Sequence, residues 1–178
     1  MYKRQQENNC LAGVNGGYFH PDRTPLGLVI SYGKVLHGFE RARLLSGVLL
    51  VTRTRISLLR SAEYKPQADI RQALQAGPFL VDHGKIVAGL NADSRADRTA
   101  VLGDNAGRFA LVLCRDVTLA ELALVLSDER IISELKVNRA LNLDGGSSSG
   151  MWVRDEPRPF YRPELKSVRN YLAVVERE

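Results

Sequence analysis

The chain consists largely of short apolar runs that are separated by glycine, proline, asparagine and aspartate. Runs of about four to eight residues between such turn residues predict β-strands. Three stretches place two runs around a short turn: residues 25–39, with the turn at 32–34, residues 79–87, and residues 99–114, with the turn at 104–107. Each of them predicts a β-hairpin, so we expect a sheet that is mostly antiparallel or mixed.

Helical patterns are few. The clearest covers residues 118–137, where Thr118 stands three residues before Glu121 in the arrangement of a capping box. We therefore interpret these two side chains as structural and not catalytic. Residues 68–76 also have helical propensity and spacing and end at a Gly-Pro pair, and a further helix is expected to begin near Ser127.

Many short strands with two to three inserted helices predict the α+β class. A doubly wound α/β fold is less favoured because strands and helices do not alternate along the chain. With 178 residues, the chain has the size of one domain. We expect this domain to cover residues 10–178 and to follow a polar N-terminal segment at residues 1–9.

The composition is that of a globular protein with a moderately basic surface. The net charge is +5, from 25 Lys and Arg against 20 Asp and Glu, which favours anionic ligands. The basic residues are dispersed and aromatic residues make up only 7% of the chain, so nucleic-acid binding is not expected. No apolar run reaches the roughly 18 residues of a membrane span, and residues 1–10 lack the apolar centre of a signal peptide.

The segment ALNLDGGSSSGMW, at residues 140–152, raises the main functional question. Its composition is typical of a flexible turn, but apolar residues on both sides predict that its ends lie in the core. Gly145 and Gly146 can expose backbone amides to an anion, the serines at 147–149 add hydroxyl donors, and Asp144 supplies a carboxylate that can act as nucleophile or base. A turn and an anion site both remain open from these residues alone.

The segment NGGYF, at residues 15–19, has a similar design, since a strand ends in an amide side chain followed by two glycines. Asn15 could hydrogen-bond a sugar hydroxyl. Tyr18 and Phe19 could pack against a sugar ring or within the core, and the core is favoured.

Several motifs follow one another in a characteristic order: NGGYF with PLGLVI, AGPFLVDHGK, RTAVLG with GRFALVL, TLAELA, ALNLDGGSSSGM and SVRNYLAVV. In this order they resemble the phosphodiester glycosidase family, which includes the lysosomal enzyme that removes N-acetylglucosamine from a phosphodiester on mannose 6-phosphate. The resemblance covers nearly all of residues 10–178, and LNLDGG followed by serines is its most specific part.

The resemblance implies that Asp144 is catalytic. It also implies that surrounding polar and glycine positions bind substrate, namely Asn15, Gly16, Arg98, Gly145, Gly146, Ser147, Ser148 and Arg169. The chain departs from the family pattern at three points. Ser147 stands where members often have a third glycine, Arg95 is an alternative to Arg98, and the strands that usually precede NGGYF are expected to be missing.

A phosphate monoester is a good leaving group, because its second pKa is about 6. Cleavage of a sugar 1-phosphodiester therefore needs a phosphate clamp and one carboxylate near the sugar C1, with less need for a general acid than in ordinary glycoside hydrolysis. A second proton-transferring group stays open among Asp82, Asp93, Asp97, His20 and His83.

Two functions follow from these observations. The first is a hydrolase that cleaves a sugar 1-phosphodiester or a related cell-surface glycoconjugate, and the second is a non-catalytic module that binds anionic polysaccharide. The expected partner is thus a carbohydrate phosphodiester or an anionic glycan, and no cofactor or metal is expected. The resemblance implies an extracytoplasmic location, whereas the sugar, the stereochemical outcome and the oligomeric state are not fixed.

Overall fold

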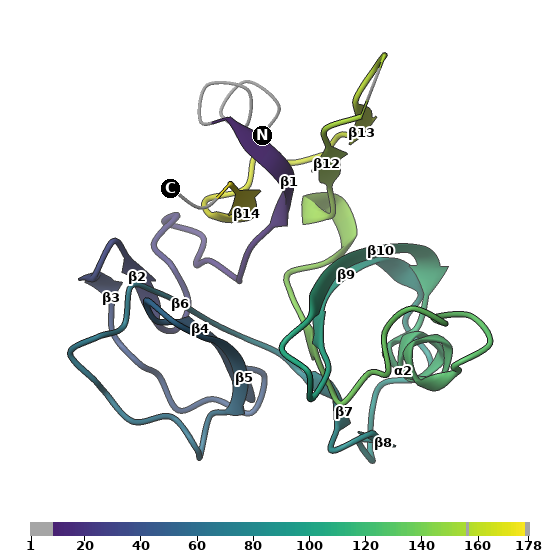
Figure 1. The fold of residues 1–178 in the computed structure, drawn as a ribbon, viewed down its shortest axis with the longest axis horizontal. Helices are drawn as coiled ribbons and strands as arrows, with labels where there is room; N and C mark the ends of the chain where they lie inside the picture. Colours follow the sequence, from purple (N-terminus) through teal and green to yellow (C-terminus); the bar gives the residue numbers. More distant parts are fainter. Residues whose placement is uncertain (1–8, 156, 177–178) are drawn as a thin grey trace.

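The computed structural model describes residues 9–155 and 157–176, and this part of the chain forms fourteen β-strands arranged in three antiparallel sheets. Figure 1 shows the sheets in three separate regions of the molecule. The polar segment predicted at residues 1–9 lies outside the described residues apart from Asn9.

The first sheet contains strands from both ends of the chain, and we call it the terminal sheet. Its order is β13-β12-β1-β14. The strands are β1 (Cys10–Asn15), β12 (Met151–Val153), β13 (Phe160–Arg162) and β14 (Tyr171–Val175). In Figure 1 it lies at the top of the molecule.

The second sheet has the order β10-β9-β11-β7-β8 and carries the helix α2 (Leu119–Ser127), so we call it the helix-bearing sheet. Its strands are β7 (Phe79–Asp82), β8 (Lys85–Ile86), β9 (Ala96–Gly103), β10 (Phe109–Val117) and β11 (Arg139–Asn142). A short 3-10 helix, η1 (Gly146–Ser148), follows β11.

The third sheet has the order β3-β2-β6-β4-β5. We call it the hairpin sheet, and it consists of β2 (Val29–Ser31), β3 (Lys34–His37), β4 (Gly47–Val51), β5 (Ile56–Arg60) and β6 (Gln72–Ala76). Tyr32 and Gly33 join β2 to β3 and both have a positive φ, of 50° and 80°, as the common two-residue hairpin turn requires.

The main core lies where the three sheets face one another. One buried cluster contains Val14 of the terminal sheet, Leu49 and Leu74 of the hairpin sheet, and Phe79 and Leu141 of the helix-bearing sheet. Because successive residues of a strand point to opposite faces, the neighbours of these residues lie on the other face of each sheet. The three sheets thus share one apolar centre, and the strand ends around it can meet.

The helix α2 covers the second face of the helix-bearing sheet. Its Leu122 and Leu126 are buried and pack in one cluster with Leu80 and Leu102 of the strands below. Among the described residues no helix is long and apolar enough to cross a membrane.

The predicted α+β class with two to three helices is wrong. The described chain is mostly β-structure, and α2 is its one α-helix. The hairpins predicted within residues 25–39, 79–87 and 99–114 are confirmed as β2–β3, β7–β8 and β9–β10. The helix predicted from the capping box is confirmed in its first nine residues.

The helix predicted at residues 68–76 is instead the strand β6, which pairs with β2 on one side and with β4 on the other. Its alanines and glutamines have helical propensity, but pairing and burial on both sides override so weak a preference. Gln75 has no exposed surface, and its side chain is satisfied by bonds to the backbone, donating to Glu40 O (2.7 Å) and accepting from Leu28 N (2.9 Å).

The further helix expected near Ser127 is also absent from the described residues, because α2 ends there and a loop follows. The Asp128 side chain accepts a hydrogen bond from the backbone N–H of Arg130 at 2.9 Å. Such a local bond competes with continuation of a helix, so the helical pattern of residues 128–137 is not realised.

Candidate active site

Three strand ends meet at Asp144. This residue follows β11, and its backbone N–H donates to the carbonyl of Gly16 at 3.0 Å, just after the end of β1. The carbonyl of Asp144 accepts hydrogen bonds from Asn15 Nδ2 at 2.7 Å and from Thr99 Oγ1 of β9 at 3.0 Å. The end of the buried β11 strand is therefore tied to the terminal sheet and to the adjacent strand.

The glycine and serine loop is packed against the protein and does not project into solvent. Residues 144–147 are half-buried, and residues 148–150 are buried. Ser149 Oγ donates to the carbonyl of Asp97 at 2.9 Å. The Ser147 carbonyl accepts the backbone N–H groups of Leu165 and Lys166, both at 2.9 Å. The loop is thus held on one side by β9 and on the other by the segment before β14.

The Asp144 carboxylate lies among hydrogen-bond donors from its own loop. The backbone N–H of Gly145 donates to its Oδ1 at 2.9 Å. Burial raises the pKa of this carboxyl above its ordinary value, while hydrogen bonds from the Ser148 hydroxyl and the Gly145 N–H act in the opposite direction. A partly desolvated carboxylate of this kind is a better base or nucleophile than one in open water.

Arg98 lies next to the same loop. A Cβ placed on Gly145 would be 3.3 Å from Arg98 Nη1 and 3.3 Å from the Asp97 carbonyl oxygen, so the guanidinium lies directly against this glycine. The hydrogen bonds of Arg98 go to backbone carbonyls, from Nη2 to Ser94 at 2.9 Å and from Nε to Val117 at 3.4 Å. None of the described carboxylates forms an ion pair with it. This half-buried cation therefore keeps its charge available for an anion.

Tyr18 packs beside the strand end that carries Asp144. Its hydroxyl donates to the Gly77 carbonyl at 2.6 Å, lies 3.3 Å from the Leu143 carbonyl, and accepts from Asn142 Nδ2 at 3.1 Å. The tyrosine thus links the loop after β1 to the ends of β6 and β11. Its hydroxyl is engaged within the protein, which agrees with the favoured core role.

Electrostatics also place Tyr18 close to both charged groups. Its pKa is raised mainly by burial and further by the negative charge of Asp144, while the hydrogen bond from Asn142 and the positive charge of Arg98 oppose this rise. The phenol consequently stays protonated at any ordinary pH. Asp144 and Arg98 share the surroundings of one buried hydroxyl.

The second glycine motif packs against the segment before β14. The Gly16 N–H donates to the Asn170 carbonyl at 3.0 Å, and the Gly17 N–H donates to Asn170 Oδ1 at 2.7 Å. Arg169, the residue before Asn170, is exposed and forms no ion pair within the described chain. The structure thus brings Arg169 to the neighbouring loop, but among the described residues its side chain forms no hydrogen bond or ion pair with Asp144.

Several of the remaining sequence candidates have other partners. Arg95 pairs with Glu121 at 2.7 Å and is therefore a weaker anion ligand than Arg98. Asp82 pairs with Arg60 at 2.8 Å, and Asp97 lies 3.4 Å from Arg162 Nη2. Of the proposed second carboxylates, only Asp97 adjoins the loop, through its carbonyl.

Asp93 and His20 lie in loops, and the His83 side chain is 71% exposed beside Asp82. Within the described residues, no three His, Cys, Asp or Glu side chains form a group suited to a metal ion.

Sequence reasoning missed two of the residues that organise the site, Thr99 and Asn170. Each is the immediate neighbour of an arginine that the motifs did single out. Their partners are distant in the sequence, since Thr99 bonds to Asn15 and Asn170 to Gly17. Both residues stand in motifs quoted above, RTAVLG and SVRNYLAVV, but a motif does not reveal partners so far away in the sequence.

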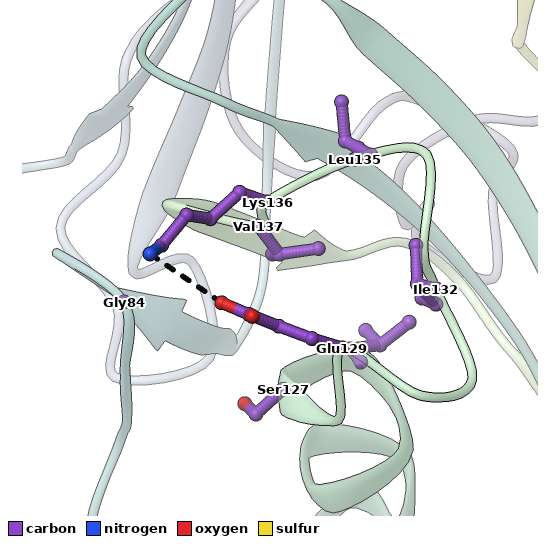
Figure 2. Close-up of a pocket in the computed structure, with 8 residues that line it drawn as sticks. Gly84, Ser127, Glu129, Ile132, Leu135, Lys136 and Val137 are labelled. Carbon is purple, nitrogen blue, oxygen red and sulfur yellow. Dashed lines mark ion pairs between the residues drawn. The ribbon is translucent and has the colours of Figure 1, made fainter.

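The structure also contains a small cavity of about 70 Å³ between the end of α2 and the following loop (Figure 2). Lys136 Nζ and Glu129 Oε1 lie 3.5 Å apart at this cavity. Sites for small molecules usually enclose about 300–1,000 Å³, and none of the lining residues belongs to the cluster around Asp144. We place the candidate site at Asp144 because its carboxylate and the Arg98 guanidinium both adjoin Gly145.

Comparisons with known proteins concern the fold and the family of the chain. No curated protein matches the chain. Its fold is similar to the zebrafish N-acetylglucosamine-1-phosphodiester alpha-N-acetylglucosaminidase catalytic domain, described as auto-inhibited by its pro-peptide, with 22% identity and a TM-score of 0.69 over 97% of this chain. The match spans 65% of the zebrafish chain.

A hypothetical protein from Synechocystis has 17% identity and a TM-score of 0.51, over 84% of this chain and 48% of that one. These two likenesses concern the fold. Residues 8–175, which include all of the candidate site, match the phosphodiester glycosidase family itself, so the resemblance seen in the ordered motifs is confirmed. The chain belongs to the phosphodiester glycosidase family.

Proposed function

We propose that the protein is a hydrolase that cleaves the glycosidic bond of a sugar 1-phosphodiester or a related glycoconjugate. One observation carries this proposal: the half-buried Asp144 carboxylate and the Arg98 guanidinium, which pairs with no described carboxylate, both adjoin Gly145. A carboxylate for the sugar and a cation for the phosphate are the two charges that this reaction needs.

The site supplies one carboxylate, and this suits the chemistry. The bond from the sugar C1 to the ester oxygen breaks, and the oxygen leaves with its electron pair as a phosphate monoester. Because its second pKa is about 6, this group leaves without the strong general acid of ordinary glycosidases. Asp144 acts at C1, either as the nucleophile or as the base that takes a proton from the attacking water.

The loop residues serve as the phosphate clamp. Gly146 has a φ of 62°, a conformation that favours glycine, and it turns the chain so that backbone N–H groups can face an anion. Gly145 and Ser148 hold the Asp144 carboxylate, so Gly146 and Ser147 offer their amides, and Ser147 its hydroxyl, to the phosphate. Arg98 can bind two phosphate oxygens at once. Gly16 adjoins this cluster through its bond to Asp144, and the exposed Arg169 is the chain neighbour of Asn170, to which Gly16 donates. The substrates we propose are cell-surface glycans, and the location we propose for the protein is therefore outside the cytoplasm.

The test is release of free sugar from a sugar 1-phosphodiester by the purified protein. Asp144→Asn keeps the size of the side chain but removes its charge, so we expect turnover to fall by a factor of about 10³ or more. Asp69→Asn is the matched control, because Asp69 is an exposed turn residue and is not a candidate for catalysis. Equal activity of Asp144→Asn and the parent would refute the catalytic assignment.

The second function, non-catalytic binding of anionic polysaccharide, is favoured by the same accessible cation. It predicts binding without turnover, weakened by Arg98→Ala and unaffected by Asp144→Asn. The hydrolase instead predicts that Arg98→Ala raises KM for the diester while Asp144→Asn lowers kcat. Equilibrium binding and steady-state kinetics on these two variants separate the functions.

A further inference from the structure

Two buried side chains hold the backbone of Asp144. Its carbonyl accepts from Asn15 Nδ2 at 2.7 Å and from Thr99 Oγ1 at 3.0 Å. The Thr99 hydroxyl also lies 2.9 Å from Asn15 Oδ1, so its one proton is shared between two acceptors. Asn15 and Thr99 are both 0% exposed. Neither can contact a substrate as the protein stands.

The same pair fixes the surroundings of the carboxylate. Asn15 Oδ1 accepts the N–H of Gly150 at 3.2 Å, so Asn15 bonds to both ends of the loop between Asp144 and Gly150. Thr99 is the direct neighbour of Arg98 on β9 and also accepts, through its carbonyl, the Leu143 N–H at 2.9 Å. The Asp144 carboxylate, its loop and the strand β9 that carries Arg98 are therefore held by one set of hydrogen bonds.

We propose that Thr99, acting with Asn15, is a positioning residue that sets the direction of the Asp144 carboxylate relative to the Gly145 amide and Arg98. The proposal rests on the proposed function for the role of Asp144. It assigns Asn15 to the support of the catalytic group, where the motif had suggested a direct contact with sugar. Thr99 had no role in the sequence analysis.

The physical reason is that the backbone of Asp144 determines where its side chain points. The Cα–Cβ bond of Asp144 follows its own peptide planes, and the C-terminal plane contains the carbonyl that Thr99 and Asn15 bind. Loss of one donor lets that plane rotate, which displaces the carboxylate from the C1 of a bound sugar. A displacement of about 1 Å can reduce a rate by about 10²-fold without loss of substrate binding.

The first test compares Thr99→Val with Thr99→Ser. Valine keeps the shape but removes the hydroxyl, whereas serine keeps the hydroxyl. We expect Thr99→Val to lower kcat by about 10- to 100-fold with KM nearly unchanged, and Thr99→Ser to restore most of kcat. Val101→Ala is the control for destabilisation, because Val101 is buried on the same strand but belongs to the apolar core.

A second measurement needs no substrate. The Asp144 carboxyl can be titrated by carbon-13 NMR in the free protein, with Asp144→Asn providing the assignment. Two charged or titratable groups lie near it: Tyr18, from the loop after β1, whose pKa responds to the charges of Asp144 and Arg98, and Arg98, from β9, which adjoins Gly145. In Thr99→Val the displaced carboxylate would accept weaker hydrogen bonds from Gly145 and Ser148, which would stabilise its charged form less. The pKa of Asp144 should therefore rise, and the acidic limb of the pH profile of kcat should move to higher pH.

The outcomes are distinct. A parental kcat or a parental Asp144 titration in Thr99→Val overturns the positioning role, even where the parent protein hydrolyses the diester. An equal shift of the titration in Val101→Ala also overturns it, because general loosening would then explain the effect. If Asp144→Asn proved fully active, the proposed function would fail, but the titration would still decide whether Thr99 orients the Asp144 side chain.

Discussion

Gly16 marks the closest approach between the two glycine motifs and the segment before β14. A Cβ at this position would lie 2.0 Å from Asn170 Oδ1 and 3.1 Å from the Asn170 backbone carbon. The backbone atoms of Gly16 are also in use, since its N–H bonds to Asn170 and its carbonyl to Asp144. The position therefore needs a residue without a side chain for reasons of space.

Gly16→Ala should consequently be damaging. We expect the free energy of unfolding to fall by about 2 kcal/mol, as for overpacking of a close contact, and kcat to fall because the Asp144 backbone bond is strained. Gly38→Ala is the matched control, because a Cβ there would meet nothing within 4 Å. Urea denaturation of both variants checks this, and equal stability of the two would show that Asn170 moves away freely.

At the residue level, the sequence motifs led to the charged residues of the candidate site but not to the residues that support them. Asp144 and Arg98 could be singled out because they stand in motifs that are contiguous along the chain. The bond from Asn15 to Asp144 spans 129 positions, and the bond from Gly17 to Asn170 spans 153. Such pairs depend on how the sheets come together, which local motifs do not specify.

The element that the sequence predicted best is the start of α2, where the capping box is fully formed. Glu121 N donates to Thr118 Oγ1 at 3.1 Å, and Thr118 N donates to Glu121 Oε2 at 2.9 Å. Both bonds join residues three apart, so the spacing alone could predict them. The strand β6 is the opposite case, because its pairing partners β2 and β4 lie elsewhere in the sequence.

Thr118→Ala should lower the free energy of unfolding by about 1 kcal/mol, since it removes the side-chain acceptor at the helix start. Thr118→Ser keeps the acceptor and should cost much less. Chemical denaturation measures both effects. No difference between the two variants would mean that the loss of packing at Thr118, which is 3% exposed, matters more than the hydrogen bond.

Across the whole molecule, an ion-pair network joins the hairpin sheet to the helix-bearing sheet. Arg139, at the start of β11, donates to Glu63 from Nη1 at 2.6 Å and from Nη2 at 2.8 Å. Arg60 of β5 pairs with Asp82 of β7 at 2.8 Å. The two guanidinium groups lie 4.5 and 5.9 Å from the centre of the Phe79 ring. This network anchors one end of β11, and Asp144 follows the other end.

Through the protonation of Glu63, the network makes the free energy of unfolding depend on pH in the acidic range. Hydrogen bonds from Arg139 chiefly hold its pKa at about 2 in the folded protein, against an ordinary value of 4.5. A carboxyl whose pKa is lower in the folded than in the unfolded protein stabilises the fold at pH values above its unfolded pKa. This contribution is lost as the pH falls from about 4.5 to about 2.

Glu63→Gln should therefore be less stable than the parent at neutral pH, and the difference should close across that window because the parent loses the bond that the variant already lacks. The effect should be small, since the Glu63 side chain is 41% exposed and water screens its charge. Glu134→Gln, at an exposed loop position, is the control and should run parallel to the parent. Urea unfolding at intervals between pH 7 and pH 2 measures the three curves, and a constant difference between Glu63→Gln and the parent would mean that the Arg139 pair does not couple the sheets through charge.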